Sequence, residues 1–350
     1  MDIKEFLKEV NAVPHVSGYE NELTDVLTSK FSKYAEVSVD KFGNLVAHKK
    51  GTGNGPKVML CAHMDEIGMM VSALCENGFV KFTNIGGIDK RNILAQEVTI
   101  HGREKVFGVI GIKPPHLTSS ADMKKPVSFY DMAIDTGYSQ EKLEKLVRPG
   151  DIITFNQDIA ELKGGKITGK ALDNSVGVAA MYCAMKNLAH YNHNADIYFV
   201  ASAQEEVGLR GAKTATYNIK PDIGIAIDVT FGRASGLGEH ESSELGKGPS
   251  IAVGPGQTRK LFNALKKVAG NNNIPYQVDV IAQGGGADFY EIQIGEGGVI
   301  SILLSIPLKY MHSTVETAAI SDIENCGKLI SDYIISLQGA EEGEECYWKN

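Results

Sequence analysis

The chain has few of the residues that mark secreted or membrane proteins. Its 350 residues include only five cysteines, and no two of them form a C-x-x-C pair. An odd number of unpaired cysteines predicts free thiols in a reducing compartment, the cytoplasm, because a disulfide framework uses paired cysteines. Residues Met1–Glu5 are charged where a signal peptide needs an apolar core, and no apolar stretch approaches the length of a membrane span. We therefore expect no membrane partner.

Clusters of basic side chains are missing as well. The formal net charge is −8, from 43 acidic and 35 basic residues. Without a basic patch, we expect no nucleic-acid partner. The composition is 43% hydrophobic and 22% charged, as in ordinary globular proteins. The chain is long enough for one large domain with a smaller companion.

Two kinds of sequence pattern divide the chain. Residues 1–68 and 166–350 alternate helical periodicity with continuous apolar runs, which indicates α/β architecture. Residues 69–165 have short apolar runs separated by glycines and turns, and only residues 140–146 indicate a helix. This second pattern is typical of an all-β module. We predict a discontinuous α/β domain, a mixed sheet flanked by helices, with a β-rich domain inserted over residues 69–165.

Side chains that commonly bind metal ions lie next to five apolar runs of the sequence. In open α/β sheets, ligands bind outside the carboxyl ends of the strands, so we expect these side chains to share one crevice. Taken singly, the histidines could be buried core residues, and the aspartates a helix cap and a turn residue. The adjacent glutamates are the hardest to explain in this way, because neither is wanted in a core. Five such positions are hard to collect by accident. The residues are His63, Asp173, the adjacent pair Glu205 and Glu206, Asp228 and His312.

This set of side chains suits divalent metal ions. Two histidines and three carboxylates without a thiolate favour zinc, with cobalt or manganese also suitable. Five ligands are too many for one open catalytic zinc. We therefore predict two ions that share one bridging carboxylate. Asp173 is the natural bridge because it begins a helix between the other ligands in sequence.

The adjacent glutamates and Asp65 have separate roles in this interpretation. If residues 197–206 form a strand, Glu205 and Glu206 point to opposite sides, so that Glu206 binds metal while Glu205 faces water. Glu205 then takes a proton from that water and returns one to the leaving group. Asp65 is placed to accept the second ring N–H of His63.

At these residues the chain closely resembles the cytosolic di-zinc aminopeptidases that build tetrahedral particles. That family includes glutamyl and deblocking aminopeptidases and proteins once labelled cellulases. The matching segments are Ala62–Gly68, Ala171–Asn174, Gln204–Ala212, Asp228–Thr230 and Tyr310–Ser313, with Gly108–Gly111, Lys113–Leu117 and Arg148–Asp151 in the insert. The resemblance implies a zinc-exopeptidase-like catalytic domain and an inserted dimerisation domain, with dimers assembling into dodecamers.

The resemblance also implies a role for each site residue. Glu205 would be the general acid/base, and Asp65 would support His63. One ion would be held by His63, Asp173 and Asp228, and the other by Asp173, Glu206 and His312.

Three positions depart from the family's usual residues. Ser175 and Lys309 stand where arginine is usual, and Ala287 replaces the threonine of a Gly-Gly-Thr-Asp segment. None of these changes removes a ligand. The loss of two planar bidentate donors bears on substrate preference and subunit contacts. The residues that bind the substrate side chain are not indicated by the sequence.

We predict a metal-dependent aminopeptidase that removes N-terminal residues from short peptides with water activated by two metal ions. A deacylase or carboxypeptidase on the same core is an alternative, and it would need a cationic anchor for a substrate carboxylate. A glycoside hydrolase is another, and it would need two carboxylates roughly 5–9.5 Å apart across a sugar bond. A particle-forming scaffold without activity would have no need for the ligands.

Overall fold

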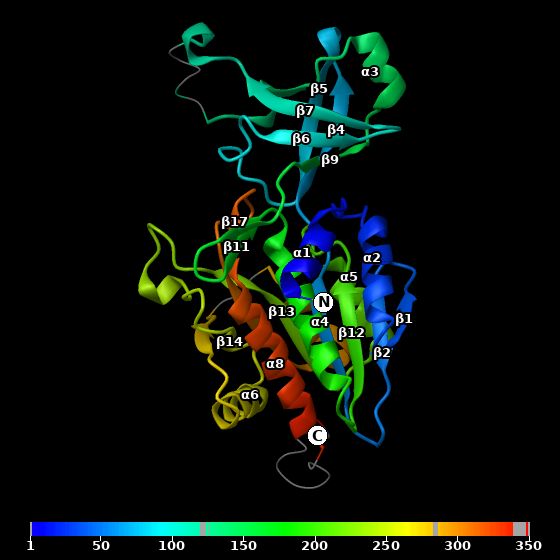
Figure 1. Ribbon diagram of the computed structural model, residues 1–350, viewed down its shortest axis with the longest axis vertical. Coiled ribbons are helices and arrows are strands. Elements are labelled where there is room, and N and C mark those ends of the chain that lie inside the picture. Colours follow the sequence, from blue (N-terminus) through cyan, green and yellow to red (C-terminus); the bar gives the residue numbers. More distant parts are fainter. Residues whose placement is uncertain (1, 120–123, 125, 283–285, 339–347, 349–350) are drawn as a thin grey trace.

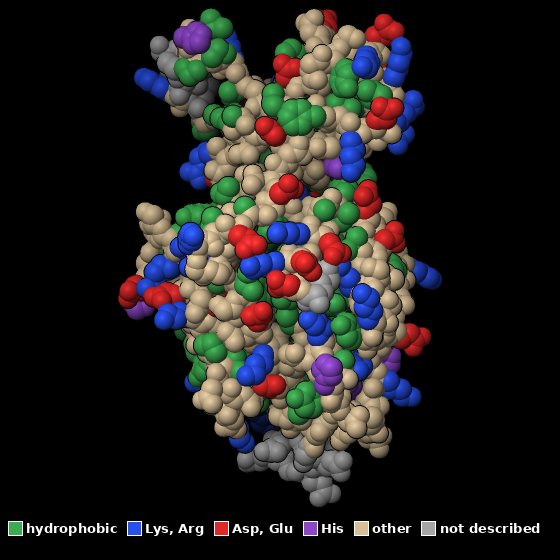
Figure 2. Space-filling view, in the orientation of Figure 1, with side chains coloured by type: hydrophobic (Ala, Val, Ile, Leu, Met, Phe, Trp, Pro, Cys, Tyr) green, Lys and Arg blue, Asp and Glu red, His purple; other side chains and the backbone are tan. Residues whose placement is uncertain are grey.

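The protein consists of two units, each built on its own sheet. The computed structural model describes residues 2–119, 124, 126–282, 286–338 and 348. One sheet has 11 strands and the other closes into a barrel. The barrel lies at one end of the molecule and the large sheet with its helices at the other (Figure 1). Figure 2 shows the molecule narrowing between the two units, with acidic and basic side chains mixed over this face.

Parallel strands form the centre of the large sheet. They lie in the order β12 (Asp196–Ser202), β3 (Lys57–His63), β13 (Ile223–Phe231) and β16 (Ile300–Lys309). In β3, every residue after Lys57 is buried, as expected of a parallel strand covered on both faces. The carboxyl ends of these strands therefore meet at one edge of the sheet.

The outer strands extend the sheet in mixed directions. β2 runs antiparallel to β12, while β17 and β14 run antiparallel to β16. The mixed sheet predicted from the sequence is confirmed. The outer strands are β1 (Glu36–Val39), β2 (Leu45–Lys49), β10 (Ala160–Leu162), β11 (Lys166–Gly169), β14 (Ser250–Val253), β15 (Gln277–Val280) and β17 (Glu316–Ala319).

Helices cover both faces of the large sheet. α4 is the most buried of them, because it lies between the sheet and the helices α1 and α8. The Phe6 ring of α1 stacks on Tyr182 of α4 with their centroids 4.7 Å apart. No helix in the described part of the chain is both long and apolar enough to cross a membrane. One face carries α1 (Ile3–Asn11), α2 (Asn21–Phe31), α4 (Leu172–Leu188), α6 (Arg259–Asn271) and α8 (Ile320–Ser336), and the other α5 (Arg210–Ile219) and α7 (Phe289–Ile294).

The barrel has its own hydrophobic core. Along β7, buried and exposed residues alternate from Lys105 to Ile110, because successive side chains of a strand point inward and outward. The predicted helix over residues 140–146 is present, whereas the short strand β8 was not predicted. The elements are β4 (Gly68–Leu74), β5 (Phe79–Ile85), β6 (Glu97–His101), β7 (Lys105–Ile112), β8 (Met132–Asp135), β9 (Ile152–Phe155) and α3 (Gln140–Leu146).

The predicted end of the insert needs a local correction. Strand β10, which lies within the predicted insert of residues 69–165, pairs with β11 in the large sheet. The last strand of the barrel ends at Phe155. The barrel strands therefore stop before the boundary that glycine and turn content indicated.

A buried ion pair lies where the chain passes between the two units. Nζ of Lys170, which precedes α4, lies 2.8 Å from Oε2 of Glu66, which links β3 to β4. Both residues are buried, and the His15 ring lies 3.5 Å from the same carboxylate. Burial alone would raise the pKa of Glu66, but His15 and Lys170 hold it below its usual value. This pair ties the segment that leaves the large sheet to the segment that enters α4.

Candidate metal centre

The predicted ligands meet at the edge of the large sheet that faces the barrel. His63 ends β3, Asp228 lies in β13, and Asp173 is in the first turn of α4. Glu206 follows β12, and His312 lies between β16 and β17. All of them fall into groups whose donor atoms lie within 4.8 Å of one another.

Asp173 belongs to two of these groups. In the first, Nε2 of His63 lies 3.2 Å from Oδ1 of Asp173 and 3.8 Å from Oδ1 of Asp228. In the second, Nε2 of His312 lies 3.5 Å from Oδ2 of Asp173 and 3.3 Å from Oε1 of Glu206. The two oxygens of one carboxylate thus face two different histidines. This is the arrangement expected of a carboxylate that bridges a pair of ions.

The orientation of His63 is fixed by the backbone of Asp65. Nδ1–H of His63 donates to the backbone carbonyl of Asp65 at 3.0 Å, whereas the Asp65 carboxylate lies 3.7 Å from the ring. Asp65 is thus the predicted partner of the second ring N–H of His63, and it accepts this N–H through its backbone carbonyl and not through its carboxylate. Nε2 is left as the ring nitrogen that faces Asp173 and Asp228.

The Asp65 carboxylate instead holds the turn that carries the two glutamates. Its Oδ1 accepts the backbone N–H of Glu205 at 2.9 Å, and its Oδ2 accepts that of Glu206 at 3.1 Å. The hydroxyl of Ser17 also donates to Oδ2. One buried acid therefore sets the position of two neighbouring site residues.

The adjacent glutamates lie in a turn and not in a strand, so the expected alternation of strand side chains does not apply. β12 ends at Ser202, and the Glu205 carbonyl accepts the N–H groups of Gly208 and Leu209. Their carboxylates nevertheless contact different histidines, although one donor atom of each also falls in a group with His63. Oε2 of Glu205 lies 4.0 Å from Nε2 of His63, while Oε1 of Glu206 faces His312.

Glu316 is a site residue that the sequence analysis missed. Its Oε2 accepts the backbone N–H of Asp173 at 3.0 Å, and its Oε1 accepts that of His312 at 2.8 Å. Glu316 is only 2% exposed, so these bonds are sheltered from water. It begins the four-residue strand β17, which carries no motif that would have drawn attention to it.

Two of the three departures from the family pattern, Ser175 and Ala287, are buried. The Ser175 hydroxyl donates to the carbonyl of Ala171 within the first turn of α4. Ala287 precedes Asp288, another buried acid, which accepts hydrogen bonds from Ser202 and Cys61. Ser202 and Cys61 belong to the strands that lead to Glu205 and His63, so Asp288 joins these strands near the centre.

The electrostatics of the centre favour bound cations. Burial raises the pKa of Glu205 to about 10 and that of Asp228 to about 8, with His63 opposing both shifts. Burial also raises the pKa of Glu206. The hydrogen bonds to Asp173 and Glu206 raise the pKa of His312 to about 11. Buried carboxylates that outnumber their positive partners, with imidazole nitrogens among them, fit divalent metal ions.

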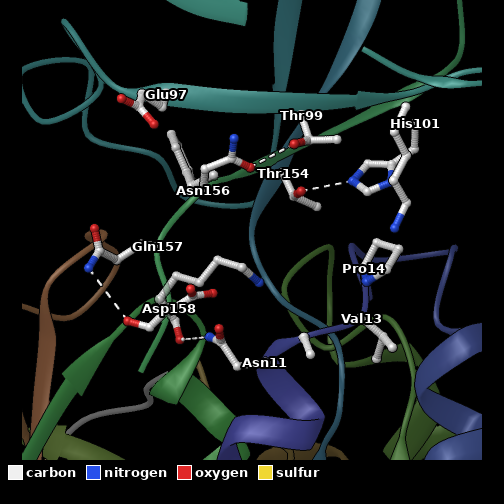
Figure 3. A pocket seen from close by; sticks show the side chains of 14 residues that line it. Asn11, Val13, Pro14, Glu97, Thr99, His101, Thr154, Asn156, Gln157 and Asp158 are labelled. Atoms are coloured by element: carbon white, nitrogen blue, oxygen red, sulfur yellow. Dashed lines mark hydrogen bonds between the residues drawn. The ribbon is translucent and has the colours of Figure 1, made fainter. Parts of the chain in front are cut away.

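A separate cleft of about 400 Å³ lies at the junction of the two units (Figure 3). The His101 ring lies 2.8 Å from the Thr154 hydroxyl, and Thr99 donates to Asn156 at 2.7 Å. Among the residues that the structure describes, none of the groups of metal-type donors lies in this cleft. We therefore place the chemistry at the edge of the large sheet.

Comparison with known proteins gives relatives over nearly the whole chain. The family model of the M42 glutamyl aminopeptidases matches residues 43–329. Lysyl aminopeptidase from Pyrococcus furiosus is 38% identical, with 95% of this chain and 97% of that protein covered. A solved aminopeptidase from Desulfurococcus kamchatkensis has a TM-score of 0.90 at 35% identity, and 98% of each chain is covered. The TET1 peptidase of Pyrococcus horikoshii, which assembles into a tetrahedron or an octahedral shell, has a TM-score of 0.84 at 33% identity, with 95% and 99% covered.

Replacing Glu316 by glutamine tests its place in the centre. Only one of the two amide positions accepts a hydrogen bond, so either Asp173 or His312 loses its backbone partner. We expect metal affinity to fall about 10- to 100-fold, the usual effect of losing a group that orients a ligand. Isothermal titration with Zn²⁺ measures this affinity. Glu324→Gln, at an exposed position of α8, is the control, and equal affinities in the two variants would contradict the assignment.

Proposed function

This chain belongs to the M42 glutamyl aminopeptidase family and is an aminopeptidase, and from that premise we propose that it removes N-terminal residues from short peptides with two divalent metal ions. The observation that carries the proposal is the shared position of Asp173 between two donor groups. One ion would be held by His63, Asp173 and Asp228, and the other by Asp173, Glu206 and His312.

The proposal gives Glu205 the proton transfers. Bound divalent ions supply the polarisation of the scissile carbonyl and the lowered pKa of the attacking water. Oε2 of Glu205 lies 4.0 Å from Nε2 of His63, and Glu205 also falls in a third donor group with His63 and Glu206. Neither of the two proposed ligand sets uses it. Its carboxylate is therefore free to accept a proton from water and to donate one to the leaving amine. Asp65 keeps Glu205 in place through the backbone N–H.

Zinc is the proposed metal, because paired imidazole and carboxylate donors suit it. Cobalt and manganese tolerate the same donors. The glycoside hydrolase alternative leaves His63 and His312 without a role, and a deacylase or carboxypeptidase would need a cationic anchor that no observation identifies. The aminopeptidase function accounts for the whole donor set.

A panel of aminoacyl-para-nitroanilides tests the function. We expect cleavage of at least one member, loss of cleavage after dialysis against a chelator, and recovery on addition of Zn²⁺, Co²⁺ or Mn²⁺. Peptides blocked at the N-terminus serve as the matched control and should resist cleavage. Activity that survives complete removal of metal would refute the metal-dependent mechanism.

Substitution of the adjacent glutamates separates their proposed roles. In Glu205→Gln, metal content should be retained while kcat falls by about 10²- to 10⁴-fold, the usual contribution of general acid/base catalysis. In Glu206→Gln, metal content itself should fall, because a ligand is weakened. Atomic absorption and steady-state kinetics measure the two effects, and equal metal loss in both variants would refute the division of roles.

We also propose that the chain forms a homo-oligomer through its barrel and acts in the cytoplasm. Support for the assembly comes from apolar side chains on the outer side of β7, where Phe107 is 54% and Val109 40% exposed. Cysteines of the described part are free thiols, as suits a reducing compartment, and Cys346 lies outside the described residues. Sedimentation velocity should show dimers or dodecamers, with smaller species for Phe107→Glu. Wild-type protein that stays monomeric at micromolar concentration would exclude the assembly.

A further inference from the structure

A turn of the barrel touches the metal centre. Gly86 and Gly87 follow β5, and both lie against predicted ligands of the second ion. A Cβ atom built on Gly86 would lie 3.3 Å from Oε2 of Glu206, and one built on Gly87 would lie 2.9 Å from Nδ1 of His312. A Cβ on either glycine would therefore crowd a proposed ligand, and at Gly86 it would also lie 2.7 Å from Cγ2 of Ile67.

Gly87 lacks room for a side chain, and its backbone conformation does not itself require glycine. Its backbone does not have a positive φ angle, so another residue could adopt the same conformation. A Cβ there would, however, also lie 3.1 Å from Cε1 of His312, which is closer than ordinary van der Waals contact. Any side chain at residue 87 therefore has to displace the His312 ring.

His312 needs such a support more than His63 does. His63 is 2% exposed, and its ring donates to the carbonyl of Asp65. The His312 side chain is 33% exposed, and Glu316 holds its backbone but not its ring. A second link joins the same parts of the molecule, because Thr314 donates to Gln96 at the far end of the β5–β6 connection.

We propose that the inserted barrel completes the metal centre, with the Gly86–Gly87 turn as the wall that positions Glu206 and His312. This inference rests on the proposed function, since it concerns the ligands of the second ion. A ligand held in one orientation binds metal more tightly than one that must be ordered on binding. Gly87 is therefore a positioning residue, and the barrel contributes to the site as well as to assembly.

Metal binding to Gly87→Ala is the test. We expect the affinity of one of the two ions to fall about 10- to 100-fold, with the other ion bound as in the wild type. Gly270→Ala in α6, outside the proposed assembly surface, is the control, because its added Cβ would meet no atom within 4 Å. Equilibrium dialysis with Zn²⁺ and the visible spectrum of the Co²⁺ form report on binding without any activity measurement. Wild-type protein that fails to bind two ions would refute the proposed function, whereas identical binding by wild type and Gly87→Ala would refute only the inference.

A double substitution shows whether the effect passes through the His312 ring. In a His312→Ala background, the clash is gone, so adding Gly87→Ala should change neither metal content nor thermal unfolding. If Gly87→Ala alone does not fold, the double variant should fold as His312→Ala does. A double variant that binds less metal or unfolds earlier than His312→Ala would show a defect independent of His312 and would overturn the inference.

Discussion

The concentration of buried carboxylates at one sheet edge is the constraint on which the rest of this structure depends. Asp173, Asp228, Glu205 and Glu206 lie together, and within the described part of the chain their donor groups include two imidazoles, those of His63 and His312. Burial of charge without compensation is strongly unfavourable, and it raises the pKa of Glu205 to about 10 and of Asp228 to about 8. Divalent cations bound there would remove this penalty, which would link the stability of the edge to its proposed chemistry.

Buried acids outside the proposed ligand sets give the centre its shape. Asp65 accepts the backbone N–H groups of Glu205 and Glu206, and Glu316 accepts those of Asp173 and His312. A carboxylate has two oxygens, so each of these acids can fix two residues at once. The side chains of these residues then remain free to face the proposed ions or water, because it is their backbones that are held. Some acids hold backbone N–H groups while others face the proposed ions, so the centre contains more buried acids than ligand positions.

The sequence predicts the ligands better than it predicts their supports. His63 and Asp228 could be identified because each lies at or near the carboxyl end of a continuous apolar run, where a polar side chain is unexpected. Glu205 and Glu206 were assigned correctly to the same edge, but the strand ends earlier, at a turn that the apolar run does not reveal. Glu316 acts on a residue 143 positions away, and no local periodicity records such a contact.

The barrel shows the same limit at the level of whole units. The frequent glycines of this part of the sequence identify an inserted β module. They do not show which glycines form turns and which make room for a neighbouring side chain. Gly87 lacks the positive φ angle that turns demand of glycine, and what distinguishes it is the His312 ring beside it. The buried pair of Lys170 and Glu66 ties together the chain segments that run between the two units. A unit inserted next to a catalytic edge can in this way become part of that edge, because the short link from β3 to β4 keeps the two in contact.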